Sequence, residues 1–297
     1  MNGKEKLKLG VVQMSMSDEP EENTAKAEAM VRDAAAQGAE LICLPELFRS
    51  RYFCQTEDYR RFDLAEPIPG PTTERFATLA AELDVAIVLS LFEARAPGLY
   101  HNTAALVDGE HGFVGRYRKM HIPDDPRYYE KFYFTPGDLG FKVYPARTVR
   151  LGLLVCWDQW YPEAARLTAL MGAQVLVYPT AIGWHPEEQR TVGPAQHGAW
   201  ETIQRSHAIA NGCFVVAANR TGFEPDPSGN GGIQFWGQSF VVGPDGVVLA
   251  RAGQDEETVL MVELDFARIA AQRQGWPFLR DRRIDSYAPL ERRYLDD

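Results

Sequence analysis

The stretch VRLGLLVCWD, Val149–Asp158, is a short apolar run that ends at a cysteine. The run is long enough for a buried strand and too short for a helix. A helical pattern then begins, with Pro162 suited to a first turn and Ala164 and Leu167 at the spacing of one helical face. Cys156 is therefore expected where a buried strand gives way to a helix.

A cysteine at such a junction has two possible roles. The partial positive charge of a helix N-terminus lowers the pKa of a thiol and favours the nucleophilic thiolate. The alternative is a buried core cysteine, which is the commonest environment of this residue type. Cys156 is thus a candidate nucleophile, and the groups that would serve it must come from elsewhere in the chain.

Strand-like and helix-like segments mix along the whole chain of 297 residues, without a fixed-period repeat or a domain linker. This pattern predicts one compact α/β domain of layered sheets and helices over residues 1–297, with about 266–297 as a C-terminal arm. Seven arginines lie in the last thirty residues of an otherwise acidic chain. They form either a solvated basic tail or an arm that pairs with acidic surface on its own or a neighbouring subunit.

Composition excludes several classes of function. The net charge of −10 argues against general nucleic-acid binding, because a phosphate backbone would repel most of the surface. The four cysteines form neither a zinc motif nor a disulfide framework, and no histidine spacing suggests a metal, so we expect no metal and no cofactor. No apolar run has the length of a signal peptide or a bilayer span, which predicts a reduced, cytoplasmic protein without a membrane partner.

Two further residues have the chemistry that a thiol nucleophile needs. Glu46 directly follows the apolar run ELICLP, and Lys119 lies in the polar segment GRYRKMH. Binding and catalytic groups gather at the carboxyl ends of strands in α/β sheets. Glu46 could take the thiol proton if burial raises its pKa, while Lys119 and the backbone N–H of Trp157 could stabilise an oxyanion. Taken singly, a Glu or a Lys is usually a surface residue.

The chain resembles the nitrilase superfamily of carbon–nitrogen hydrolases. The matching motifs are LICLPELF around Glu46, GRYRKMHIP around Lys119 and GLLVCWDQWYPEAARL around Cys156. The resemblance implies that Glu46 is the general base, Lys119 the oxyanion-stabilising cation and Cys156 the nucleophile, with Glu130 as a second glutamate that orients the lysine and the substrate. It also implies a four-layer αββα sandwich, dimerised through its outer helices and C-terminal arm or assembled into a higher homo-oligomer.

Within this superfamily, four segments are similar to the branch that hydrolyses N-carbamoylputrescine: His121–Asp138, Cys156–Arg166, His207–Arg220 and Trp276–Tyr287. This similarity implies conversion of N-carbamoylputrescine to putrescine, carbon dioxide and ammonia, a step of polyamine biosynthesis. The loop Ala181–Arg190 matches less closely. A related amidase, or a ureidopropionase-like carbamoylase acting on another small amide or N-carbamoyl compound, remains the alternative.

Charge near the motifs favours a cationic carbamoyl-amine substrate. A carbamoylated amino acid would need an arginine for its carboxylate, and none follows Cys156 until Arg166. Carboxylates near the motif loops could instead hold a protonated amine, with aromatic walls around its methylene chain. The residues expected to contact substrate are Trp157, Asp125, Tyr52, Phe53, Glu187 and Trp160. A catalytically silent protein on the same fold is disfavoured because Glu46, Lys119 and Cys156 are all present.

Overall fold

Two six-stranded sheets form the centre of the computed structural model, which describes residues 6–229 and 231–296. The first sheet has the order β15 (Thr258–Asp265), β1 (Lys6–Gln13), β2 (Leu41–Cys43), β3 (Ala86–Ala96), β4 (Leu99–Asp108) and β5 (Gly112–Arg118). The second has the order β14 (Val248–Arg251), β13 (Phe240–Val242), β10 (Phe214–Asn219), β8 (Val175–Thr180), β7 (Val149–Leu153) and β6 (Lys142–Ala146). A small sheet of β11 (Thr221–Pro225), β12 (Gly232–Trp236) and β9 (Gly183–Trp184) lies beside them.

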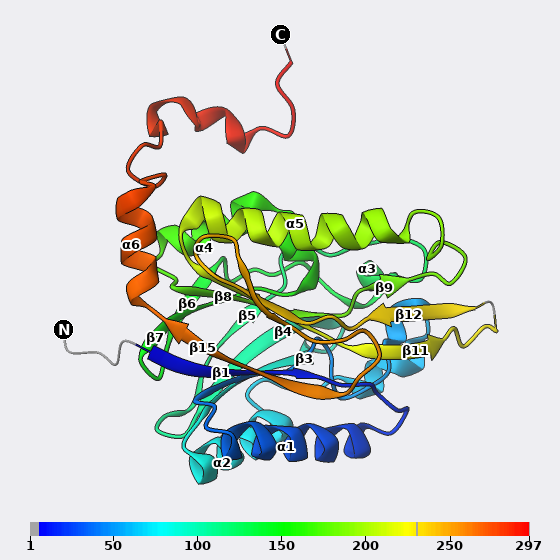
Figure 1. Ribbon diagram of the computed structural model, residues 1–297. Coiled ribbons are helices and arrows are strands. Elements are labelled where there is room, and N and C mark those ends of the chain that lie inside the picture. The colour runs from blue at the N-terminus through cyan, green and yellow to red at the C-terminus, as the bar shows by residue number, and fades with distance from the viewer. Residues whose placement is uncertain (1–5, 230, 297) are drawn as a thin grey trace.

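Helices cover the outer face of each large sheet (Figure 1). On the first sheet these are α1 (Pro20–Ala36) and α2 (Pro71–Leu83), and on the second α4 (Pro162–Leu170) and α5 (Gly193–Asn211). The remaining helices are α3 (Glu130–Tyr133), α6 (Ala267–Gly275) and the 3₁₀ turns Phe53–Gln55, Tyr59–Leu64, Cys156–Trp160, Ile284–Ser286 and Ala288–Glu291. The layers run helix, sheet, sheet, helix, so the predicted αββα sandwich is confirmed.

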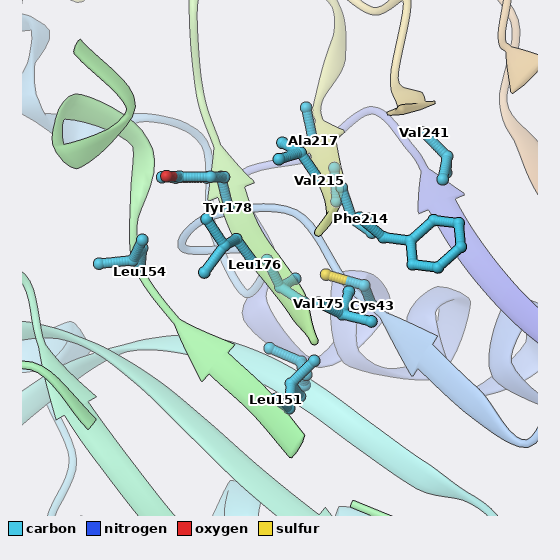
Figure 2. Packing of buried hydrophobic residues seen from close by; sticks show 14 of the residues in the cluster. Cys43, Leu151, Leu154, Val175, Leu176, Tyr178, Phe214, Val215, Ala217 and Val241 are labelled. Carbon is cyan, nitrogen blue, oxygen red and sulfur yellow. The ribbon is translucent and has the colours of Figure 1, made fainter. Parts of the chain in front are cut away.

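The main core lies between the sheets, where both contribute fully buried side chains. Strands such as β8 and β10 are buried along their whole length, which explains their continuous apolar sequences. Figure 2 shows Cys43 of β2 beside Val175 and near Leu151 and Phe214 of the opposite sheet. Cys43 is a core thiol, and burial raises its pKa above the ordinary value of a thiol.

The topology brings strand ends from both sheets to one place. β2 is parallel to β1 and β3 in the first sheet, and β8 is parallel to β7 and β10 in the second. Glu46 lies just after β2, Lys119 directly after β5, Cys156 after β7 and Arg220 directly after β10. Residues far apart in the sequence therefore meet at one edge of the sandwich.

The chain beyond β15 leaves the sandwich as α6 and an extended segment (Figure 1). Arg268 pairs with Asp245 at 2.9 Å, and Arg273 donates to the backbone carbonyl of Asn211 at 3.1 Å. These contacts anchor α6 on the body, whereas the large apolar side chains Ile284 and Leu290 farther along are mostly exposed. In the part of the chain that the structure describes, no helix is both long enough and apolar enough to cross a membrane.

Candidate active site

A buried lysine joins two buried carboxylates at the strand ends. Lys119 Nζ lies 2.9 Å from Glu46 Oε1 and 2.6 Å from Glu130 Oε2. All three side chains are at most 1% exposed. Buried charges are tolerated when they are paired and hydrogen-bonded, as here. The structure therefore brings together three of the four residues predicted to be catalytic, in direct contact.

Neutral side chains also donate hydrogen bonds to both carboxylates of this cluster. Asn102 of β4 donates from Nδ2 to Glu46 Oε1 at 2.7 Å, and the Tyr52 hydroxyl donates to Glu130 Oε1 at 2.7 Å. Asn102 was not predicted from the sequence. It appears there only as a polar residue within a buried strand, which does not by itself indicate what the side chain contacts.

Cys156 completes the group from the second sheet. It is 5% exposed, and its backbone φ is +37°, a left-handed conformation that costs a non-glycine residue about 1–3 kcal/mol. The residues that follow form a five-residue 3₁₀ turn, Cys156–Trp160, and α4 begins only at Pro162. Cys156 therefore lies between the strand and the helix, as predicted, but at the start of the 3₁₀ turn and not of the α-helix.

Asp158 holds this turn in place. One of its carboxylate oxygens accepts from the Val155 N–H and the Tyr117 hydroxyl, both at 2.9 Å. The other accepts from the His121 N–H at 3.1 Å and lies 2.7 Å from His121 Nδ1. Asp158 thereby ties the turn that carries Cys156 to the segment that carries Lys119. A carboxylate two residues after the cysteine was visible in the sequence, but its partners were not.

The electrostatics of Cys156 differ from the prediction. Burial raises the pKa of its thiol well above the ordinary value, and the charge of Glu46 adds to the effect, while Lys119 opposes it in part. The expected lowering by a helix N-terminus is not found, because the thiol is buried beside a carboxylate and no α-helix starts at it. The resting nucleophile is thus a neutral thiol that needs a base.

The lysine and the second glutamate are shifted by the same surroundings. Burial by itself would lower the pKa of Lys119, but the carboxylates of Glu130 and Glu46 outweigh it and raise that pKa well above its usual value. Burial raises the pKa of Glu130 to about 7, against the opposing effect of Lys119. Lys119 therefore remains a cation across the neutral range.

A second buried ion pair supports the loop that carries Glu46. Arg220 Nη2 donates to the backbone carbonyls of Glu46 at 2.7 Å and Leu47 at 3.2 Å, and Nη1 pairs with Glu224 at 2.7 Å. Glu224 in turn accepts from the backbone N–H of Tyr52 at 2.5 Å. Leu47 has a φ of +49°. Arg220 and Glu224 thus stabilise the strained loop that carries Glu46. The sequence did not indicate this role.

A cavity of about 490 Å³ opens above Cys156 and Glu130. Of the residues predicted to contact substrate, Trp157, Trp160 and Asp125 line it. The wall also includes Glu188, one of the motif-loop carboxylates that could hold an amine, and three residues that the sequence did not indicate: Tyr128, His185 and Trp236. Glu188 is half-buried and Asp125 is exposed, so carboxylates occupy the outer part of the cavity.

Tyr52, Phe53 and Glu187 do not line this cavity. Tyr52 lies behind it, bonded to Glu130, and Phe53 stacks on Phe92 within an aromatic cluster with centroids 5.1 Å apart. Glu187 points outward and pairs with Arg127 at 3.2 Å. The sequence placed these residues in the correct region, but adjacent residues of a loop point in different directions.

No group of three or more His, Cys, Asp or Glu side chains within residues 6–229 and 231–296 is arranged to hold a metal ion. The cationic partner of the two catalytic carboxylates is instead an amino-acid side chain, Lys119. The chemistry that this arrangement supports is acyl transfer through a thiol, a base and a fixed cation.

The carbon-nitrogen hydrolase family model matches residues 8–274, which is most of the chain. The chain belongs to the carbon-nitrogen hydrolase family. A crystal structure of a carbon-nitrogen hydrolase from Helicobacter pylori superposes with a TM-score of 0.94 at 48% identity, covering 98% of this chain and all of the other. N-carbamoylputrescine amidase from Solanum lycopersicum is 44% identical over 95% of this chain and 94% of its own length.

A third relative is named for a different substrate. Citrullinase from Francisella tularensis is 38% identical over 97% of this chain and 99% of its own length. The similarity to these proteins spans both sheets and the covering helices, so the resemblance inferred from three motifs extends over almost the whole fold. This carbon-nitrogen hydrolase is an enzyme that hydrolyses carbon–nitrogen bonds.

Proposed function

We propose that this enzyme hydrolyses N-carbamoylputrescine to putrescine, carbon dioxide and ammonia. The observation that carries the proposal is the cavity above Cys156, which has tryptophan walls and, besides the buried Glu130, the more exposed carboxylates of Asp125 and Glu188. A ureido group at the thiol would place the methylene chain along Trp157 and Trp160 and the ammonium near Asp125 and Glu188. The amidases of plants that share 42–44% of the sequence support the same substrate.

In the first half of the proposed reaction, Glu46 takes the proton of the Cys156 thiol and the sulfur attacks the ureido carbonyl carbon. The carbonyl oxygen becomes an oxyanion, which Lys119 and the backbone N–H of Trp157 stabilise. The high pKa of the buried thiol explains why a base within the same cluster is needed. Glu130 orients Lys119 through its 2.6 Å contact.

Collapse of the tetrahedral adduct breaks a carbon–nitrogen bond, and the leaving nitrogen receives the proton held by Glu46. A thiocarbamate acyl-enzyme on Cys156 remains. Glu46 then takes a proton from water, the resulting hydroxide attacks the acyl carbon, and the Cys156 sulfur leaves and recovers the proton from Glu46. The product is a carbamic acid, which decomposes to carbon dioxide and the second amine as its remaining carbon–nitrogen bond breaks. Covalent catalysis of this kind divides one difficult step into two easier ones.

The test is ammonia release by purified enzyme with three substrates side by side: N-carbamoylputrescine, N-carbamoyl-β-alanine and glutamine. The proposal expects kcat/KM to be highest for N-carbamoylputrescine by at least about tenfold, because only this substrate carries a bare ammonium. Preference for N-carbamoyl-β-alanine would agree with the thiol mechanism but contradict the proposal that the substrate is a cation. Absence of ammonia from all three would contradict the proposed substrate class.

We also propose a homodimer or higher homo-oligomer formed through α4, α5 and the C-terminal arm. Large apolar side chains are exposed there, including Leu167 and Leu170 on α4 and Trp276, Leu290 and Tyr294 in the arm. Exposed apolar surface of this kind is typical of protein interfaces. Light scattering on the full chain and on a variant ending at residue 275 tests this, with a monomeric full chain as the contradicting result.

The proposed compartment is the cytoplasm, and the proposed role is putrescine formation in polyamine biosynthesis. All four cysteines are free thiols in the structure, which suits a reducing environment. Fractionation of cells that express the full chain, followed by immunodetection, would test the compartment.

A further inference from the structure

A second hollow of about 750 Å³ adjoins the catalytic cavity and shares Pro126, His185 and Glu188 with its wall. The charged side chains around this vestibule are Glu57, Glu187, Glu188, Asp226 and Arg127. Four carboxylates and one guanidinium therefore line a hollow next to the catalytic cavity. Arg127 precedes Cys156 in the chain. An arginine expected shortly after Cys156 therefore gave no indication of it.

Arg127 is held by carboxylates from two different loops. Its Nη1 lies 3.2 Å from Glu187 Oε1 and donates to His185 Nδ1 at 3.0 Å, and its Nε lies 3.6 Å from Asp226 Oδ2. The arginine side chain is only 18% exposed, and Asp226 is 8% exposed. The guanidinium therefore has its charge matched by protein groups before any substrate arrives.

Two ureido compounds can distinguish an arginine that is available to substrate from one that is already paired. L-Citrulline is N-carbamoylputrescine with one carboxylate added to the carbon that bears the ammonium. The reacting ureido group and the methylene spacing are the same in both. An arginine available at the vestibule would bind the additional carboxylate, often through two parallel hydrogen bonds. An arginine already bound by carboxylates would not, and the surrounding negative charge would repel it.

We propose that Arg127 is a specificity-determining residue whose engagement by Glu187 and Asp226 restricts this enzyme to carbamoyl amines and excludes ureido amino acids. The inference rests on the proposed function and deepens it. Glu187 and Asp226 act on the substrate indirectly, by occupying the guanidinium, while Glu188 faces the ammonium. Release of Arg127 converts the vestibule from a site for a cation into a site for a zwitterion.

The experiment measures kcat/KM for L-citrulline and N-carbamoylputrescine in wild type, E187Q and E187Q/D226N. We expect the ratio of citrulline to N-carbamoylputrescine to rise about threefold in E187Q, whose carboxylate is exposed and screened, and at least about tenfold in the double variant. Adding R127M to the double variant should return the ratio to within about threefold of wild type, since the released guanidinium is then gone. The single variant keeps the proposal testable if the double variant is unstable.

The matched control is E57Q, which removes one negative charge from the same vestibule at a carboxylate other than the two that pair with Arg127. A ratio change in E57Q as large as that in E187Q/D226N would overturn the inference, because general electrostatics would then explain both. A tenfold loss of citrulline activity in R127M alone would also overturn it, by showing that Arg127 already binds the carboxylate. Failure of wild type to hydrolyse N-carbamoylputrescine would instead overturn the proposed function, and the inference with it.

Discussion

The catalytic cluster and the vestibule both hold carboxylates around one cation, but they differ in burial. Lys119 and its two glutamates are at most 1% exposed, whereas Glu187 beside Arg127 is 65% exposed. In the buried cluster each charge depends on its partners, so loss of one group leaves another uncompensated. At the vestibule water screens Glu187, whereas Arg127 and Asp226 are mostly buried, and the proposed effect of these charges is on the choice of substrate. The catalytic cluster is thus more completely buried than the residues proposed to select the substrate.

The largest effect is expected from Cys156→Ala. Without the nucleophilic sulfur the covalent route is lost, and kcat should fall by about four orders of magnitude or more. Circular dichroism and thermal unfolding should show an intact fold. The matched control is Cys213→Ala, another fully buried thiol in a different part of the core. Retention of most activity by Cys156→Ala would contradict the proposed mechanism.

The next largest effect is expected on stability, from loss of the arginine that holds the loop carrying Glu46. Arg220→Met leaves the Glu224 carboxylate buried without its partner, and we expect the free energy of unfolding to fall by about 3–5 kcal/mol. The double variant R220M/E224Q should recover part of that loss, because it removes the uncompensated charge. Urea unfolding of the three proteins measures this. Equal stability of Arg220→Met and wild type would show that the pair does not support the loop.

The pH dependence of stability should reveal the buried carboxylate of Glu130. Glu130 has a pKa raised to about 7 in the folded protein and near 4.5 when unfolded, so the folded state binds more protons between these values. Its contribution to stability is therefore complete below about pH 4.5 and is lost as pH rises through about 7. Relative to E130Q, wild type should lose about 3 kcal/mol over this range.

Denaturant unfolding of wild type and E130Q at pH 5, 6, 7 and 8 measures the difference. Parallel dependence on pH in the two proteins would contradict the raised pKa.

The smallest effect is expected for Glu188→Gln on substrate binding. Loss of a screened contact to the ammonium should raise KM for N-carbamoylputrescine about three- to tenfold with little change in kcat. N-Butylurea has the same ureido group and four-carbon chain without the ammonium, so its kinetics should hardly change. An equal loss with both compounds would show that Glu188 affects the cavity in general and not the amine.

The sequence pattern by itself predicted a layered α/β domain and indicated Glu46, Lys119 and Cys156, because buried strands give continuous apolar runs and the polar residues near their ends stand out. The αββα sandwich and Glu130 were implied by the resemblance of the motifs to the nitrilase superfamily. Lys119 contacts both Glu46 and Glu130, and Cys156 lines the same cavity as Glu130.

Only the tertiary structure decided which groups stabilise and surround that cluster. Asn102, Asp158 and Arg220 come from separate strands or turns, and no local pattern shows that they converge on the catalytic loops. The direction of neighbouring side chains was also hidden: Glu188 lines the cavity and Glu187 turns to Arg127. The physical reason is that sequence periodicity determines which face of a regular element is buried, whereas a loop has no such period. In loops, long-range contacts determine both side-chain direction and charge environment.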